Sequence, residues 1–197
     1  MKIRQAFLVI FLCLTAASVF GKTATNTLYF GSAGFAVSDG FTIISEGILI
    51  AGLRSTASPG DTGFYFGSDL SLGIPITVYY FDSYYGFTSM PSQDDLFMSL
   101  KIPLGYRWPG QNRSMGFYLG GGPAFQMIAD WETAVIYAVG AFAEIGWQTN
   151  KTSNVGFHFG FQLGLSPLLF SPGYGTFSNI NASEASLQFG MSWRRIK

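Results

Sequence analysis

The sequence has little of what most soluble enzymes depend on. Its 197 residues include one cysteine and one histidine, and charged residues make up 11%, less than half of the usual share of about 25%. So few cysteines exclude a disulfide framework, and with a single histidine they leave no set of soft metal ligands. The formal net charge is zero, so the composition provides no basic surface for nucleic acid. Neither a metal nor a cofactor is expected.

Residues 1–21 are predicted to be a secretory signal peptide that is removed by cleavage. Lys2 and Arg4 precede an apolar run over residues 6–17, as is typical of such peptides. Cys13 lies within this run, so the mature chain 22–197 is expected to contain no thiol. No later apolar run reaches 18 residues, which argues against a transmembrane helix in the mature chain.

The chain is instead rich in glycine and aromatic residues, and in places it alternates strictly. Residues 155–165 read VGFHFGFQLGL, with large apolar residues at odd positions and small or polar residues at even positions. Period two places these two sets on opposite faces of a strand. Since about 9–11 tilted residues cross a bilayer, one face is expected to meet lipid and the other to line a barrel.

The same period is found in eight segments, which predicts an all-β fold, an eight-stranded antiparallel up-and-down transmembrane β-barrel. The segments are 27–37, 46–54, 63–75, 96–108, 115–127, 134–148, 155–165 and 185–195. The first two are apolar on both faces, so their register is left open. Short polar connections at 55–62, 109–114 and 149–154 are expected in the periplasm, and those at 38–45, 76–95, 128–133 and 168–184 outside.

The alternation assigns each strand residue an outward or an inward parity, that is, a side chain toward lipid or toward the lumen. Four aromatic residues with outward parity lie at the periplasmic ends of their strands, where a girdle at the lipid–water boundary is expected. These residues are Tyr106, Trp108, Trp147 and Trp193. The basic residues of the mature chain avoid the expected outer loops, whereas acidic residues, Glu184 among them, occur there. This polarity favours a cationic partner outside.

The ionisable residues with inward parity are Glu46, Arg54, Asp69, Lys101, Arg107, Glu144, His158 and Arg194. All of these except Glu46 and Arg54 are candidates for ion pairs in the lumen. A basic residue on the lipid face would cost about 2–4 kcal/mol at the midplane. Asp69 is expected beside Lys101 on the neighbouring strand, and Glu144 opposite His158 across the 149–154 turn. Many other inward positions are glycine, which favours sharp strand curvature but leaves a narrow passage possible.

The segment 76–95 contains many aromatic residues and is expected to be an extracellular interaction loop. Its candidate contact residues are Tyr79, Tyr80, Tyr84, Tyr85, Asp94 and Asp95. Exposed aromatic clusters can mark an interaction site. The alternative interpretation is that residues 76–81 extend the preceding strand above the membrane.

The chain resembles the small eight-stranded bacterial outer-membrane barrels of the OmpX, OmpW and OmpA-transmembrane class. The resemblance is architectural and covers the mature chain. The closing segment from Gln188 to Trp193 is similar to the C-terminal strand signal read by the barrel-assembly machinery, although four residues follow it here. Barrels of this class that deacylate lipid A have a serine two residues after their histidine. The residue two positions after His158 in this sequence is Gly160, so the resemblance does not imply an enzyme.

Three functional hypotheses follow from these patterns. The first is a monomeric, non-enzymatic outer-membrane barrel with a structural or surface-interaction role, whose partners are the lipid bilayer and an extracellular protein or cationic ligand. The second, implied by the resemblance to OmpW, is a narrow channel for small or hydrophobic solutes. The third is a soluble β-barrel carrier, which would turn the apolar faces inward and expose Arg107 and Glu144.

Overall fold

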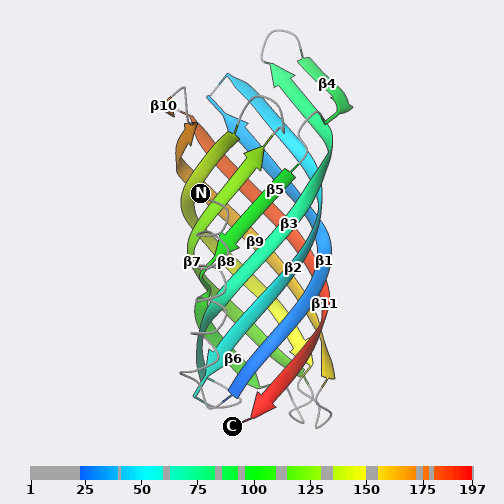
Figure 1. Cartoon of the computed structure of the whole chain (residues 1–197), viewed down its shortest axis with the longest axis vertical. Coiled ribbons are helices and arrows are strands. Elements are labelled where there is room, and N and C mark those ends of the chain that lie inside the picture. Colours follow the sequence, from blue (N-terminus) through cyan, green and yellow to red (C-terminus); the bar gives the residue numbers. More distant parts are fainter. Residues whose placement is uncertain are drawn as a thin grey trace, which may run out of the picture.

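Eight long antiparallel strands close into a barrel in the computed structural model (Figure 1). The structure describes residues 23–39, 41–59, 63–82, 86–92, 96–109, 115–129, 135–149, 155–171, 175–177 and 180–196. The predicted signal peptide, residues 1–21, lies outside these ranges. The predicted fold class is therefore confirmed for the described part of the chain.

The ring follows the order of the sequence and then closes on itself. Its members are β1 (Thr23–Ser38), β2 (Thr42–Ser58), β3 (Gly63–Asp82), β5 (Leu96–Lys101) continued by β6 (Leu104–Pro109), β7 (Met115–Ala129), β8 (Val135–Thr149), β9 (Val155–Ser171) and β11 (Asn181–Ile196). Closure comes from β1 and β11, which pair from Thr23↔Ile196 to Ser38↔Asn181. We call the end with the β2–β3, β6–β7 and β8–β9 connections the turn end, and the opposite end the hairpin end.

Two short strands stand outside the ring at the hairpin end. β4 (Gly86–Pro91) pairs with the last residues of β3, and β10 (Gly175–Phe177) pairs with the end of β9. The expected loop 76–95 is thus largely a β-hairpin, as in the alternative interpretation in which the strand continues above the membrane. Its Val, Tyr and Phe residues favour extended backbone, and pairing with β4 satisfies their N–H and C=O groups.

The connection expected at 168–184 is also mostly strand. β9 continues to Ser171 and β11 begins at Asn181, so Glu184 lies in the barrel wall and not in an outer loop. Its side chain is buried. The expectation was wrong because parity was followed only across the membrane-spanning part, whereas the strands have up to 20 residues.

One wall of the barrel is interrupted at Ile102 and Pro103, between β5 and β6. Proline has no N–H for the ladder and favours such breaks. The break is bridged by two backbone hydrogen bonds, from Gly67 N–H to Pro103 O at 2.9 Å and from Ile102 N–H to Pro123 O at 3.0 Å. β5 and β6 therefore occupy a single position in the ring.

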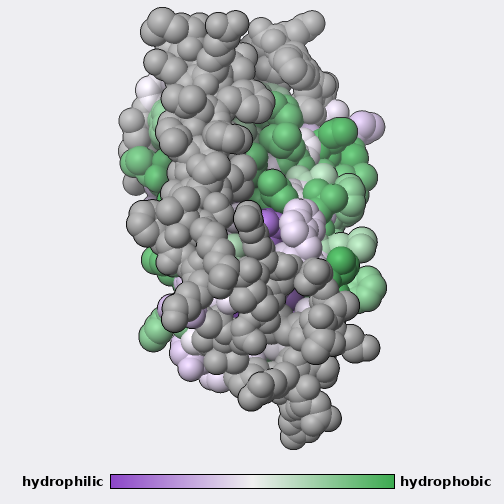
Figure 2. Space-filling view, turned by 60° about the horizontal axis from the view of Figure 1, so that its bottom comes forward, coloured by the Kyte–Doolittle hydropathy of each residue, from purple (hydrophilic) through white to green (hydrophobic). Residues whose placement is uncertain are grey.

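The outer surface is apolar over most of its height, as the alternation predicts. On β9, Phe157 is 70% exposed whereas its neighbour His158 is 4% exposed. Figure 2 shows hydrophobic side chains on the visible side wall of the barrel. This orientation is the reverse of the one that a soluble carrier requires. Among the described residues, the structure contains no helix with the length and apolar character needed to cross a membrane.

The hairpin half of the lumen is filled by apolar side chains, among them Phe35, Ile48, Phe97 and Leu169. This packing explains why β1 and β2 are apolar on both faces: near the hairpin end, one face meets lipid and the other meets this core. The register that was left open is now defined, with Tyr29 opposite Gly52 and Phe35 opposite Glu46. Outward residues of the same strands, such as Phe30, are exposed.

The turn half of the lumen contains tyrosines that lie over inward glycines. A Cβ atom at Gly120 would lie 2.3 Å from the Tyr65 hydroxyl, and one at Gly146 would lie 2.3 Å from the Tyr118 hydroxyl. Both distances are far below van der Waals contact, so any larger residue would displace the ring. These glycines therefore provide the space that the tyrosine rings occupy, and they do not leave an open passage.

Replacing Leu163 with arginine tests whether the exposed apolar band faces lipid. Leu163 lies midway along β9 and points outward. Leu163→Arg should lower the free energy of unfolding in phospholipid vesicles by about 2–4 kcal/mol, the cost of a basic side chain near the midplane. Leu163→Val is the control and should change it little. Equal stability of the two variants in denaturant titrations would show that this face does not meet hydrocarbon.

Candidate functional site

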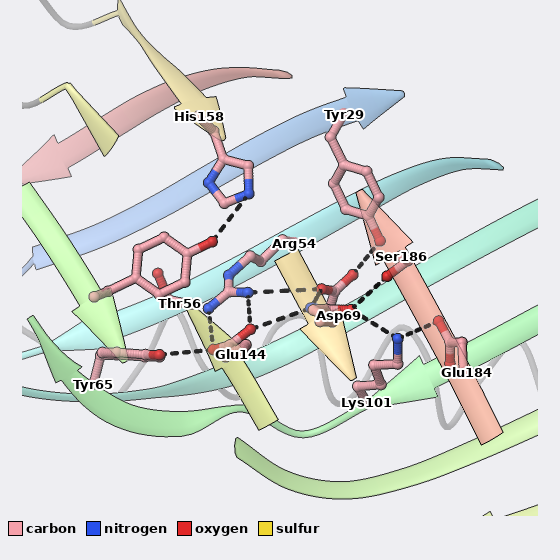
Figure 3. Close-up of polar contacts among 12 residues, drawn as sticks. Tyr29, Arg54, Thr56, Tyr65, Asp69, Lys101, Glu144, His158, Glu184 and Ser186 are labelled. Atoms are coloured by element: carbon pink, nitrogen blue, oxygen red, sulfur yellow. Dashed lines mark hydrogen bonds and ion pairs between the residues drawn. The ribbon is translucent and has the colours of Figure 1, made fainter. Parts of the chain in front are cut away.

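The candidate site is the polar network in the lumen, whose central residue is Arg54 on β2 (Figure 3). Arg54 binds Glu144 of β8 with both terminal nitrogens: Nη2 donates to Oε1 at 2.6 Å and Nη1 donates to Oε2. Nη1 also lies 3.7 Å from Asp69 Oδ2 on β3. All three side chains are buried, and a fork-to-fork pair of this kind is among the stronger ionic hydrogen bonds.

Glu144 accepts two further hydrogen bonds that complete its coordination. The Tyr65 hydroxyl donates to Oε1 at 2.7 Å, and Gln162 Nε2 donates to Oε2 at 3.1 Å. Tyr65 reaches Glu144 by lying across Gly105 and Gly120, the residues that separate the two in the register. The two glycines are thus required for this contact, because a side chain at either position would block the ring.

A second ion pair links Lys101 on β5 with Glu184 on β11. Lys101 Nζ lies 2.6 Å from Glu184 Oε1 and donates to Gln162 Oε1 at 2.7 Å. Gln126 Nε2 donates to the other Glu184 oxygen at 2.5 Å, and Ser166 donates to Gln126 Oε1 at 2.8 Å. Glu184 is therefore bound at both oxygens by buried side chains.

Gln162 joins the two ion pairs into one network. Its Nε2 donates to Asp69 Oδ2 at 2.9 Å as well as to Glu144, while its Oε1 accepts from Lys101. Asp69 also accepts a hydrogen bond of 2.5 Å from the Tyr29 hydroxyl. One amide thus contacts one residue of each ion pair as well as Asp69, and a connected network of this kind favours a single arrangement.

Both ion pairs cross the lumen between opposite strands. In a ring of eight, opposite members are four positions apart, and this separation holds for β2 and β8, for β5 and β11, and for β3 and β9. The pairs Arg54–Glu144, Lys101–Glu184 and Asp69–Gln162 therefore span the diameter of the barrel. An eight-stranded barrel encloses a space just wide enough for side chains, which is why such contacts can form.

The predicted pairing of Asp69 with Lys101 has the expected register but different side-chain partners. The two residues are Cα partners on β3 and β5. However, Lys101 binds Glu184 and Gln162, while Asp69 binds Tyr29, Gln162 and Arg54. The long lysine side chain extends across the lumen instead of along the wall.

The expected pair of Glu144 and His158 does not form. Their Cα partners across the β8–β9 turn are Gln162 and Gln148, respectively. His158 instead stacks on Tyr118 with 5.7 Å between ring centroids, and its Nε2 lies 3.3 Å from the Tyr118 hydroxyl. Parity placed both residues correctly in the lumen, but the β8–β9 turn was assigned the wrong register. The Glu144 carboxylate instead binds Arg54 across the lumen.

Arg107 lies in the lumen near the turn end, as its parity predicts. Its Nη2 contacts Thr56 Oγ1 at 3.4 Å, and its guanidinium lies over the Tyr65 ring at 5.6 Å from the centroid. The backbone of Arg194 belongs to β11, but its side chain lies outside the described part of the structure. Its proposed place in the ion-pair set therefore stays a prediction.

The structure places Tyr106, Trp108, Trp147 and Trp193 on the outer surface toward the turn end. The first three belong to a row of ring contacts that passes from β3 to β11. Its successive centroid distances lie between 4.9 and 5.7 Å and link Phe64, Tyr106, Trp108, Phe117, Trp147, Phe159 and Phe189. The role of these residues as a girdle at the lipid–water boundary stays a prediction.

The residues predicted for the interaction loop are only partly described. Tyr79 and Tyr80 belong to the extended part of β3, and Tyr79 is exposed and stacks on Phe87 of β4 at 5.8 Å. Tyr84, Tyr85, Asp94 and Asp95 lie outside the described residues. Nearby, the backbone N–H groups of Thr42 and Phe41 bind the Asp39 carboxylate and lower the pKa of this exposed group.

Several residues of the network were absent from the predicted set. Arg54 and Gln162 were placed inward by period two but were not among the ion-pair candidates, whereas Tyr65 and Tyr118 have inward parity and were not singled out. Glu184 required knowing that β11 begins before the membrane. The alternation does not indicate which inward residues contact each other across the lumen.

The charges of the two diametric ion pairs in this arrangement bind one another. Each described acidic group in the centre of the lumen is hydrogen-bonded by protein donors, and within the described ranges no three acidic, histidine or cysteine residues form a cluster that could hold a metal. The network therefore has the character of an internal plug. The fold and the apolar outer band together define a β-barrel protein of the outer-membrane class.

Comparison with solved structures supports this class. The structure of Neisserial surface protein A (NspA) has a TM-score of 0.57 at 15% identity, with 88% of this chain and 97% of that chain covered. The outer membrane protein OprG from Pseudomonas aeruginosa gives 0.53 at 13% identity, with 90% and 99% covered. At such identities the likeness is one of fold. No family model and no curated protein matches the sequence.

A double-mutant cycle tests the diametric pairing of Arg54 with Glu144. Arg54→Met and Glu144→Leu should each destabilise the barrel by about 3–5 kcal/mol, since each leaves a buried charge without its partner. The double variant should lose much less than the sum of the two. Denaturant unfolding in vesicles gives the three free energies.

The matched control cycle combines Glu144→Leu with His158→Phe. These two residues do not bind each other in the structure, so their coupling energy should be smaller than that of Arg54 and Glu144. A larger coupling between Glu144 and His158 would contradict the described network.

Proposed function

We propose that the chain is an integral outer-membrane protein with a closed lumen and a hairpin end that faces the cell exterior. Residues 1–21 would act as the export signal, and 22–197 would form the barrel. The apolar outer band and the row of aromatic rings near the turn end support this placement. The structures with the same fold include proteins named as surface and outer-membrane proteins.

The observation that carries the closed-lumen proposal is the pair of diametric ion pairs. Arg54–Glu144 and Lys101–Glu184 cross the lumen in different directions, and Gln162 fills the space between them. Toward the hairpin end, the apolar core that includes Phe97 continues the filling. Solute would have to break several buried hydrogen bonds to pass, so a non-enzymatic, structural or surface-interaction role is favoured.

The hairpin end supports the surface role through its charge and its apolar residues. Its connecting segments contain Asp94, Asp95, Asp130 and Glu132 in the sequence and no lysine or arginine. The hairpin of β3 and β4 presents exposed aromatic residues. Such a surface attracts cationic partners.

The second candidate is a narrow channel for hydrophobic solutes. It is favoured by the apolar lining of the hairpin half of the lumen, including Phe35, Ile48 and Leu169. These side chains are buried against one another, and the polar network lies below them. A passage would therefore need both layers to rearrange.

Planar-bilayer recordings distinguish the two candidates. The purified protein should give no reproducible conductance steps. A variant that carries Arg54→Ser, Lys101→Ser, Glu144→Ser and Glu184→Ser removes both diametric pairs and should conduct, provided that circular dichroism shows a folded barrel. Regular conductance steps or solute uptake by the unmodified protein would contradict the closed lumen.

Cysteine labelling of intact cells tests which end faces outside. In a Cys13→Ser background, Ser89→Cys on β4 should react with a membrane-impermeant maleimide, because β4 is exposed at the hairpin end. Pro59→Cys, at an exposed position directly after β2, should react only after the outer membrane is permeabilised. The reverse pattern would show that the turn end faces outside.

A further inference from the structure

Arg107 is a buried basic residue that lies outside the ion pairs of the lumen. Of the three basic residues whose side chains are described, Arg54 and Lys101 each bind a buried carboxylate. Arg107 is as deeply buried as they are, but it forms an ion pair with no acidic residue of the described ranges. A buried charge is costly unless it is paired and hydrogen-bonded, so Arg107 is a candidate for binding a negative ligand.

The contacts of Arg107 leave one edge of its guanidinium available. Its Nε is buried and has no hydrogen-bond partner among the described residues. Nη2, on the same edge, contacts Thr56 Oγ1 at 3.4 Å, which is long for a hydrogen bond. Two parallel N–H donors on one edge of a guanidinium match two oxygens of a phosphate or carboxylate group. This edge of Arg107 therefore has the donor geometry that binds an oxyanion.

The neighbours of Arg107 fix its guanidinium without neutralising it. It lies over the Tyr65 ring at 5.6 Å from the centroid, and Arg54 lies over the same ring at 5.7 Å. Figure 3 shows Thr56 and Tyr65 on the same side of Arg54. Gly63 is opposite Arg107 in the register, and no described atom lies within 4 Å of the place where a Cβ of this glycine would be. Space is therefore available beside the backbone at this level.

The lumen between Arg107 and the turn end is lined by small hydroxyl side chains of β1 and β2. We call this part the turn-end vestibule, and its buried residues are Thr23, Thr25, Thr56 and Ser58, in which Thr25 is opposite Thr56 and Thr23 is opposite Ser58. Hydroxyl groups can donate hydrogen bonds to an anion. On the other side, the Arg54–Glu144 pair crosses the lumen. A ligand of Arg107 therefore enters from the turn end and stops below this ion pair.

We propose that Arg107 and the turn-end vestibule form a binding site for one free oxyanion of the phosphate type. Nε and Nη2 of Arg107 bind two of its oxygens, and the Thr56 hydroxyl donates to it. The barrel wall separates Arg107 from lipid, so the ligand is a free anion and not a phospholipid headgroup. The site goes beyond the proposed function, because it assigns a ligand to the end that would face the periplasm.

Titration of the purified protein with inorganic phosphate in detergent micelles tests this site. Calorimetry at constant ionic strength should show saturable binding of one phosphate per protein. Arg107→Gln should weaken binding by about tenfold to hundredfold, as expected for the loss of a charge-assisted hydrogen bond. Arg107→Lys keeps the charge but loses the two-donor edge, so it should also bind more weakly than the unmodified protein.

Lys151→Gln is the matched control for charge. It removes one positive charge from the connection between β8 and β9, at the turn end, and should leave phosphate binding unchanged. Denaturant unfolding provides a second readout. Phosphate should raise the free energy of unfolding of the unmodified protein, as does any ligand that binds only the folded state, but it should not raise that of Arg107→Gln.

Four results would overturn the proposal. They are no saturable binding of phosphate by the unmodified protein, equal losses in Arg107→Gln and Lys151→Gln, undiminished binding by Arg107→Lys, or binding that appears only in Asp61→Asn. Asp61 is the acidic residue nearest in sequence to Gly63, the register partner of Arg107, so the last result would identify it as a partner within the chain. The Arg107→Lys comparison decides if Arg107→Gln does not fold.

The outcome of this test is distinguishable from failure of the proposed function. Both ends of the barrel are accessible in micelles, so phosphate binding does not depend on the orientation measured by cysteine labelling. Conductance by the unmodified protein would contradict the closed lumen without changing the effect of Arg107→Gln on phosphate binding.

Discussion

An eight-stranded barrel has an interior only wide enough for side chains, so each inward charge in its middle must find its counter-charge within the protein. The lumen meets this constraint with contacts across its diameter, between Arg54 and Glu144 and between Lys101 and Glu184. Gln162 connects these contacts through both ends of its amide. The turn half of the barrel therefore has a polar core that is held together by ionic and amide hydrogen bonds across the lumen, below an apolar core.

The glycines on the inner wall belong to the same arrangement. A small barrel needs residues without side chains where strands curve, but here the freed space is also used. The Tyr65 ring lies over Gly105 and Gly120 and delivers its hydroxyl to Glu144, and Tyr118 occupies the space over Gly146. Strand curvature, ring packing and the hydrogen bonds of the carboxylate thus depend on the same few positions.

Alternation along the strands was sufficient to predict the ring of eight and, on the six cleanly alternating strands, the face on which a residue lies, because side-chain direction is local. On β9, it assigned Phe157 to the outside and His158 to the lumen. The partners of the lumen residues were not predictable in this way, since opposite strands are remote in sequence and the turn register shifts them. Glu144 and His158 show the limit: both were placed inward, but they do not bind each other.

The diametric pairs join residues that are 90 and 83 positions apart in the chain. Neither pair can exist in an open sheet, where Arg54 and Lys101 would have only Asp69, their shared neighbour in the register, as a counter-charge. Neutralisation of the lumen and joining of β1 to β11 are therefore a single event during assembly. A partly inserted, unclosed barrel would be unstable in lipid, so folding and membrane insertion of this chain should be tightly coupled.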